Sequence, residues 1–183
     1  MVKVGVVNGR FQGLHLGHLE YILEAKKLCE ELIIGITNPD PVLTSDNEVD
    51  AKRSKIEENP FTYYERMIMV KNALLEHKIN RAEFEIVPFP INRPEIIKCY
   101  VPLDAIIYIT IYDEWGKFKM KTLQDFGFTT HLLWERKMSD RFTTGKEVRS
   151  LIKSGGDWEK LVPSSVAQVI KQQNLDQKIK SLK

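Results

Sequence analysis

Residues 2–20 read "VKVGVVNGRFQGLHLGHLE", and this stretch decides the fold that we expect. Val2 to Val7 is short, β-branched and nearly all apolar, which is typical of a strand buried on both faces of a parallel sheet. Apolar residues then recur at close to helical spacing between Leu19 and Leu28. The strand therefore passes into a helix through a turn rich in glycine and histidine. Glycine lets backbone approach a bound phosphate closely, because no Cβ intervenes, and the N-terminus of the next helix attracts anions.

Four more apolar segments have the length and composition of strands: 31–37, 83–89, 105–111 and 130–134. Helical patterns separate several of them. This alternation predicts an α/β protein, a doubly wound parallel sheet with helices on both faces, in one domain over residues 1–183. Ligands of such sheets bind beyond the carboxyl ends of the strands, which is where the glycine- and histidine-rich turn falls.

Composition excludes several classes of protein. Apolar residues make up 43% and charged residues 28%, as in ordinary globular domains. A net charge of +2 is too small for a surface that holds a nucleic-acid backbone. Cys29 and Cys99 lie too far apart for a zinc knuckle or a disulfide scaffold, and no long apolar segment follows basic residues at the N-terminus. We expect a cytoplasmic protein without nucleic-acid or membrane partners, and the sequence leaves a homo-oligomer open.

Two segments lack the regular pattern of the rest. Residues 38–59 are polar, charged and aperiodic, which fits either a solvated insertion or a mobile lid over a substrate. Residues 158–183 predict a C-terminal helical segment with an apolar stripe and a lysine-rich, solvated tip. Two further helix starts carry the pattern of a capping box, "TYYE" from Thr62 and "TGKE" from Thr144. Each would present free backbone N–H groups to an anion.

The histidines of "HLGH" lie about one helical turn apart, so His15 and His18 can face the same bound group. Both can donate hydrogen bonds to phosphate oxygens. A two-histidine metal site is an alternative, but no third ligand is evident nearby, and we predict no protein metal site. Ordinary structural histidines are the other alternative.

The string "GRFQGLHLGHL" resembles the signature of the HxGH nucleotidyltransferases, closest to the archaeal-type nicotinamide mononucleotide (NMN) adenylyltransferases, whose pattern runs GRFQPxHxGH. The resemblance continues through "ENPFTYYER", "VPFPINR", "TTGKEVRSLI" and "DWEKLVPSSVAQVI", in the same order as in the family. It implies a Rossmann-like nucleotidyltransferase fold.

The resemblance also implies roles for single residues. His15 and His18 would contact the phosphates of a nucleoside triphosphate, with His18 stabilising the charge that develops during transfer, and Arg149 would clamp the outgoing pyrophosphate. The implied nucleotide-binding residues are Gly9, Arg10, Phe11, Gln12, Gly17, Thr144, Gly145 and Lys146. Of these, Arg10 and Gln12 would hold phosphates, while Gly9 and Phe11 would shape the turn. Arg66 is a weaker candidate, for which a surface salt bridge is equally expected.

This sequence departs from the family pattern mainly on the acceptor side. Gly13 replaces the proline of the signature, which loosens the turn, and Lys146 replaces a threonine. The family's arginine and nearby stacking tryptophan give way to "NRPEIIKCYVPLD", so Asn92, Arg93, Tyr112 and Trp115 are the candidate acceptor-binding residues. Either aromatic ring could stack on an acceptor, or it could serve in core packing. The "KMS" of residues 137–139 is similar to a loop of class I aminoacyl-tRNA synthetases, but the chain is too short for one.

We therefore expect a nucleotidyltransferase that transfers AMP from ATP to NMN, giving NAD and pyrophosphate. The reaction needs positioning and charge stabilisation and no covalent nucleophile. Mg²⁺ would be held mainly by substrate phosphates and waters. One alternative is a cytidylyl- or adenylyltransferase that acts on a different small phosphomonoester, and another is a nucleotide-binding regulator without turnover.

Overall fold

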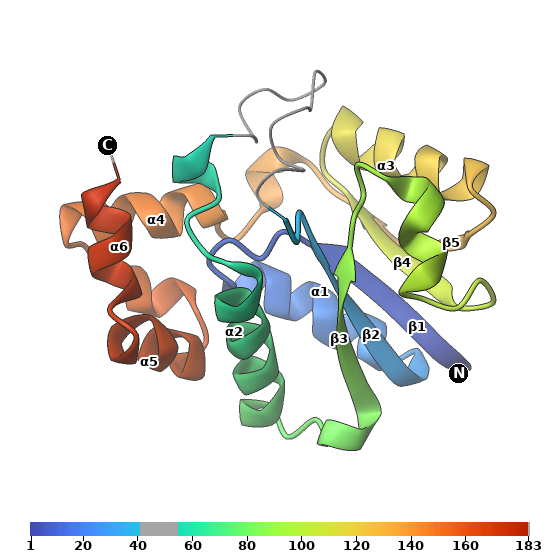
Figure 1. The fold of residues 1–183 in the computed structure, drawn as a ribbon, viewed down its shortest axis with the longest axis horizontal. Helices are drawn as coiled ribbons and strands as arrows, with labels where there is room; N and C mark the ends of the chain where they lie inside the picture. The colour runs from blue at the N-terminus through green and yellow to red at the C-terminus, as the bar shows by residue number, and fades with distance from the viewer. Residues whose placement is uncertain (41–54, 183) are drawn as a thin grey trace.

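A five-stranded parallel sheet forms the centre of the computed structural model, which describes residues 1–40 and 55–182 (Figure 1). Its strands are β1 (Val2–Gly9), β2 (Cys29–Thr37), β3 (Phe84–Phe89), β4 (Ile106–Ile111) and β5 (Thr129–Glu135). They lie in the order β3-β2-β1-β4-β5, and every neighbouring pair is parallel. All five predicted strands are confirmed. Because the chain winds outward from β1 in both directions, the carboxyl ends of β1 and its neighbours border a crevice.

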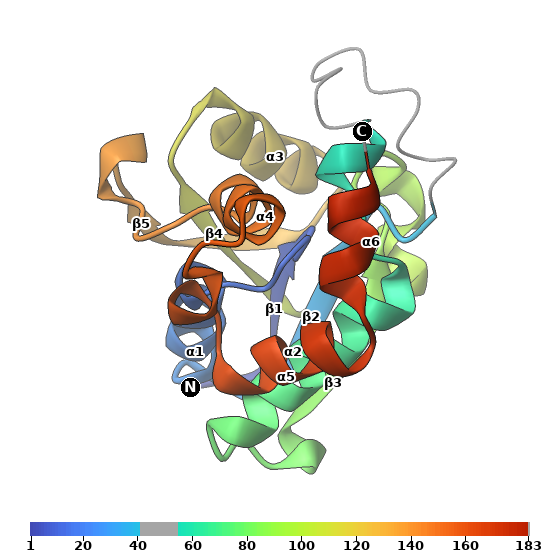
Figure 2. The same ribbon diagram turned by 90° about the vertical axis from the view of Figure 1, so that its left-hand side faces the viewer.

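Helices cover both faces of the sheet, as predicted (Figures 1 and 2). They are α1 (Leu16–Lys26), α2 (Tyr63–Glu76), α3 (Glu114–Asp125), α4 (Gly145–Ser154), α5 (Ser164–Gln172) and α6 (Leu175–Ser181). Short 3₁₀ turns lie at Ile56–Glu58, Arg81–Glu83, Pro94–Cys99, Met138–Asp140 and Trp158–Leu161. The first helix begins at Leu16, earlier than its apolar pattern suggests, because the HxGH motif supplies its first turn.

Alternating residues of the strands feed two apolar cores. Val7 and Ile34 point to a core that α1, α2 and the C-terminal helices complete. Val6 and Ile33 point to the opposite face, where α3 and the Pro94–Cys99 turn pack. Burial of one strand on both faces explains its nearly continuous apolar sequence.

The C-terminal segment differs from the single helix expected over 158–183. It forms a 3₁₀ turn followed by α5 and α6, because Pro163 lacks the backbone N–H that a continuous helix needs and Asn174 has a left-handed φ of 52°. The tip is also less solvated than expected. Ile179 is buried, and Lys178 donates to both carboxylate oxygens of Glu65 on α2, at 2.9 and 2.8 Å.

The two capping predictions have different outcomes. Thr62 and Glu65 form a complete box, with each side chain accepting from the backbone N–H of the other. Thr144 does accept from the N–H of Glu147 at 3.2 Å, but the Glu147 carboxylate accepts from the Thr143 hydroxyl instead of closing the box.

Most of the predicted lid or insertion, residues 41–54 of 38–59, lies outside the described residues. The part that is described includes the Ile56–Glu58 turn. Cys29 and Cys99 are free thiols, one buried and one exposed. Within residues 1–40 and 55–182, the helices are all too short or too polar to cross a membrane.

Candidate functional site

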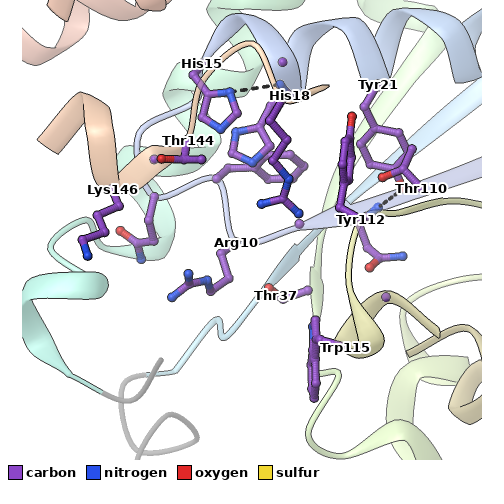
Figure 3. A pocket seen from close by; sticks show the side chains of 18 of the residues that line it. Arg10, His15, His18, Tyr21, Thr37, Thr110, Tyr112, Trp115, Thr144 and Lys146 are labelled. Atoms are coloured by element: carbon purple, nitrogen blue, oxygen red, sulfur yellow. Dashed lines mark hydrogen bonds between the residues drawn. The ribbon is translucent and has the colours of Figure 1, made fainter. Parts of the chain in front are cut away.

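A cavity of about 430 Å³ opens at the carboxyl ends of β1, β2 and β4, where the N-terminal turns of α1, α3 and α4 also meet (Figure 3). It collects all of the residues that the sequence singled out for the site except Arg93 and the weaker candidate Arg66. Those that line it are Gly9, Arg10, Phe11, Gln12, His15, Gly17, His18, Asn92, Tyr112, Trp115, Thr144, Gly145, Lys146 and Arg149. Helix N-termini carry partial positive charge, so their convergence favours an anionic ligand.

The turn after β1 has the backbone that its sequence demands. Phe11 is fully buried with a positive φ of 50°, and its ring lies 2.9 Å from the position that a Cβ on Gly9 would take. Gly13 has a φ of 83°, which proline cannot adopt because its ring fixes φ near −65°. The glycine therefore gives this turn a backbone conformation closed to the proline of the family signature.

His15 caps α1 through its ring. Its Nδ1 accepts from the backbone N–H of His18 at 3.3 Å, and the two imidazoles stack with centroids 3.7 Å apart at 22°. Because Nδ1 is an acceptor, the proton of a neutral His15 lies on Nε2. A Cβ on Gly17 would approach the His15 ring at 3.3 Å, so glycine between the histidines leaves room for the stack.

Both imidazoles are uncharged at neutral pH. Burial, followed by the charges of Arg141 and Arg149, lowers the pKa of His15 from 6.5 to about 3. Burial, followed by His15, Arg10 and Arg141, lowers the pKa of His18 well below its ordinary value. A neutral imidazole still offers one N–H to a phosphate oxygen. Binding of a polyanion would oppose the neighbouring guanidinium charges, so it would raise both pKa values.

Arg149 reaches the cavity from α4 and is buried, with its side chain 7% exposed. One guanidinium nitrogen donates to the backbone oxygen of Gln12 at 2.9 Å, and another pairs with the carboxylate of Glu58. Glu58 comes from the Ile56–Glu58 turn and begins the "ENPFTYYER" stretch, but the sequence analysis gave it no role. A bound anion would therefore meet a guanidinium that is already fixed in place.

Gln12 lines the cavity, and its side chain also holds the turn after β1 in place. Its amide donates to the backbone oxygen of Phe61 at 3.0 Å, and its carbonyl accepts from the Phe61 N–H at 2.9 Å. Both ends of the carboxamide are thus used to hold the turn against the segment before α2. A phosphate contact of Gln12 stays a prediction, because Nε2 carries a second N–H besides the one that donates to Phe61.

Two other predicted phosphate contacts, Thr144 and Lys146, lie across the cavity from the acceptor candidate Trp115 (Figure 3). Thr144 and Lys146 project near His15 and His18, and Arg10 lies toward the middle (Figure 3). Lys146 is exposed and Thr144 half-buried. Among the described residues that line the cavity as a whole, Lys and Arg outnumber Asp and Glu, which again suits an anion.

Three of the four acceptor candidates, Asn92, Tyr112 and Trp115, line the cavity. Arg93 does not: it is exposed just before the Pro94–Cys99 turn and pairs with Glu95 at 2.5 Å. The Tyr112 ring is already covered by the Arg141 guanidinium, 4.3 Å from its centroid. Trp115 is therefore the aromatic side chain better placed to meet a ligand.

Arg66 is neither a surface ion pair nor a cavity residue. It is 2% exposed and donates to the backbone oxygens of Thr37 at 2.7 Å and of Arg10 and Asn38 at 2.8 Å each. Burial lowers its pKa to about 10, so it remains a cation. Arg66 thus ties α2 to the ends of β1 and β2, beneath the site.

Several cavity residues escaped the sequence analysis. Asn8, Thr37 and Thr110 are polar residues at the carboxyl ends of β1, β2 and β4, so the rule that ligands bind there could have found them. Arg141 follows the Met138–Asp140 turn of the "KMS" segment, and this arginine lines the cavity while Lys137, Met138 and Ser139 do not. Among the residues that the structure describes, no group of three or more His, Cys, Asp or Glu could hold a metal ion.

Comparisons with known proteins agree with this geometry. The sequence profile of the Cytidylyltransferase-like family matches residues 6–139. The chain is 44% identical over 177 residues to the phosphonoformate cytidylyltransferase of Streptomyces viridochromogenes, covering 97% of this chain and 95% of that protein. It is 32% identical over 169 residues to the nicotinamide-nucleotide adenylyltransferase of Archaeoglobus fulgidus, covering 90% and 88%.

Among solved structures, a bifunctional NMN adenylyltransferase/ADP ribose pyrophosphatase from Francisella tularensis superposes with a TM-score of 0.68 at 17% identity. The superposition covers 99% of this chain and 53% of that longer protein, so this likeness concerns the fold. Taken with the HxGH turn and the cavity that it lines, the profile match and the relatives show that this chain belongs to the Cytidylyltransferase-like family and is a nucleotidyltransferase.

Proposed function

We propose that this protein transfers CMP from CTP to a small phosphonate or phosphate acceptor and releases pyrophosphate. The transfer chemistry is supported by one observation above all: two neutral, stacked histidines, a buried arginine and the N-terminus of α4 line one cavity. The choice of CTP and a small acceptor is supported by 44% identity, over nearly the whole length of both chains, to a phosphonoformate cytidylyltransferase. The adenylyltransferase relatives match at lower identity.

In this reaction an acceptor oxygen attacks the α-phosphorus in line, the new P–O bond forms, and the bond to the β-phosphate oxygen breaks. We assign to His18 a hydrogen bond to the oxygen that gains charge, and to Nε2–H of His15 a second phosphate contact. Arg149 and the N-terminus of α4 hold the departing pyrophosphate. Donors that are fixed before the reaction stabilise the transition state without reorganisation, which is the main requirement here.

Mg²⁺ remains part of the proposal. Mg²⁺ is commonly held by substrate phosphates and waters, with few protein ligands, so the ion would arrive on the nucleotide. Its contribution would be to neutralise charge on the triphosphate. We expect EDTA to abolish pyrophosphate release and added Mg²⁺ to restore it.

Transfer of AMP from ATP to NMN is the second candidate, and Trp115 favours it. Its ring lines the cavity on the side where an acceptor would lie, so it could stack on nicotinamide. A small acceptor such as phosphonoformate needs no aromatic platform. The two candidates therefore differ in what Trp115 does.

A pyrophosphate-release assay decides between them. The purified protein is given CTP or ATP in turn, each with phosphonoformate, a simple phosphomonoester or NMN. The proposal requires release with CTP and a small acceptor, and release only with ATP and NMN would replace it with the second candidate. Nucleotide binding without release from any pair would indicate the regulator. His18→Ala is the inactive control, and His131→Ala, on an exposed histidine outside the cavity, is its matched partner.

A further inference from the structure

Asn8 is a buried polar side chain whose hydrogen-bonding groups are unused. It is 3% exposed and lines the cavity, yet neither Nδ2 nor Oδ1 has a hydrogen-bond partner among the described residues. Buried amides are nearly always paired, and an unpaired one is costly. An unpaired amide at the wall of a ligand cavity indicates that a ligand supplies the partner.

The local structure isolates this side chain. The backbone N–H of Asn8 donates to the hydroxyl of Tyr21 at 3.3 Å, and that hydroxyl donates onward to the backbone oxygen of Tyr108 at 2.6 Å. The register partner on β2 is Gly35, which has no side chain to offer, and the ring of Phe89 fills the space above it. The backbone N–H of Asn8 thus has a hydrogen-bond partner, whereas its side-chain carboxamide has none among the described residues.

Strand alternation places this carboxamide on the acceptor side of the sheet. Residues two apart on a strand share a face, and Val6 packs into the core formed with α3 and the segment after β3. Asn8 therefore shares a face with these elements, which bring Asn92 and Trp115 to the cavity. The two histidines and α4 stand across the cavity from Trp115 and Thr37 (Figure 3).

We propose that Asn8 is a specificity-determining residue for the acceptor, and that its Nδ2 donates a hydrogen bond to an oxygen beside the reacting phosphoryl group. This inference rests on the proposed two-substrate transfer. The role of Asn8 makes the proposed function more specific, because it requires an acceptor with a second small oxygen-bearing group, such as a carboxylate. Arg10 and Lys119 line the same cavity and supply positive charge for such an anion.

The test compares Asn8→Leu, Asn8→Asp and Asn8→Ser by steady-state kinetics, with nucleotide affinity measured separately by calorimetry. Asn8→Leu keeps the size and removes the donor, so KM for the acceptor should rise about 10- to 100-fold, the range for one hydrogen bond to a charged group. Nucleotide affinity should stay within about twofold, since the lost contact is to the other substrate. Asn8→Asp should be worse, because a carboxylate repels an anion, and Asn8→Ser should retain part of the affinity.

A folding readout separates recognition from a structural role. Removing an unpaired buried amide leaves no broken hydrogen bond, so the melting temperature of Asn8→Leu should equal or exceed that of the unaltered protein. Asn72→Leu, a half-buried asparagine of α2 outside the cavity, controls for the type of substitution. An unchanged acceptor KM, or a rise confined to the nucleotide, would overturn the assignment of Asn8.

The kinetics use whichever acceptor the unaltered protein turns over. Failure with CTP and phosphonoformate but turnover with ATP and NMN refutes the proposed function, and Asn8 is then tested with NMN. If the Asn8 variants have the same acceptor KM as the unaltered protein, only the role of Asn8 is refuted. If the unaltered protein neither turns over any acceptor of the panel nor binds one by calorimetry in the presence of nucleotide, both are wrong. If Asn8→Leu does not fold, Asn8→Ser and Asn8→Asp carry the same comparison.

Discussion

His18 is the residue whose loss should separate catalysis from folding most cleanly. Its Nδ1 is buried and without a hydrogen-bond partner in the described part of the chain, so no hydrogen bond of that atom is broken when the ring is removed. We expect His18→Ala to lower kcat by about 100- to 1,000-fold, the usual cost of removing one preorganised donor. The melting temperature should change little. Turnover equal to that of His131→Ala would refute the role given to His18.

The same two histidines predict how stability depends on pH. Their pKa values are lowered in the folded protein, to about 3 for His15, while in the unfolded chain both lie near 6.5. Between these pKa values the unfolded state binds more protons than the folded state. The free energy of unfolding therefore falls as the pH drops below 6.5, and above pH 6.5 the two histidines no longer reduce it. In that pH window each of the two histidines should lower the free energy of unfolding by about 1.4 kcal/mol for every unit by which the pH falls.

Urea unfolding at pH 7.5 and pH 5 measures this dependence. The double variant His15→Gln/His18→Gln should lose less stability than the unaltered protein on going to pH 5, because its glutamines do not titrate. All other ionisable groups are the same in the two proteins, so the comparison cancels their contribution. Equal slopes would mean that neither imidazole is held neutral by the fold. A bound triphosphate should reduce the slope, since it raises both pKa values.

The N-terminus of α4 is the element on which the site depends most closely. A Cβ on Gly145 would lie 2.9 Å from the backbone oxygen of Gln12 and 3.1 Å from a guanidinium nitrogen of Arg149. The backbone cannot yield easily, so Gly145→Ala must displace the helix or the arginine. We expect a loss of about 1–3 kcal/mol in unfolding free energy, typical of overpacking, together with a large fall in kcat.

Ser150→Ala is the matched control for that substitution, because Ser150 is an exposed residue of the same helix. It should leave both stability and turnover near those of the unaltered protein. Chemical denaturation and pyrophosphate release measure the two quantities on the same samples. Full activity of Gly145→Ala would show that Arg149 does not need its present position.

Across the whole molecule, the sequence predicted the features that depend on residues close together in the chain, and it did not predict side-chain contacts between distant residues. The five strands and the HxGH helix follow from local alternation and spacing, and the carboxyl-end rule then locates the cavity. The Glu58–Arg149 pair joins residues 91 positions apart, and Arg66 donates to the carbonyl groups of Thr37, at the end of β2, and of Arg10, just after β1. Nothing in the local sequence specifies such partners, so the sequence left Arg66 open as a weak site candidate or a surface ion pair, whereas it is buried outside the cavity.

The C-terminal helices also support the elements that form the site. α6 packs against α4, which carries Arg149, and is tied to α2 through Lys178 and Glu65. Ile179 anchors it in the core that α1, α2 and α4 share. Among the described residues α6 contributes none to the cavity lining, so it supports the site through stability.

Ile179→Ala tests whether α6 contributes to stability only or also affects turnover. Truncation of a fully buried isoleucine leaves a void, so we expect a loss of about 2–5 kcal/mol in unfolding free energy. At a temperature well below the lowered transition, kcat and both KM values should match those of Gln177→Ala, an exposed change on the same helix. Thermal inactivation should instead begin at a lower temperature. A reduced kcat in fully folded Ile179→Ala would mean that α6 sets the position of α4 during turnover, because no residue of α6 lines the cavity in the described structure.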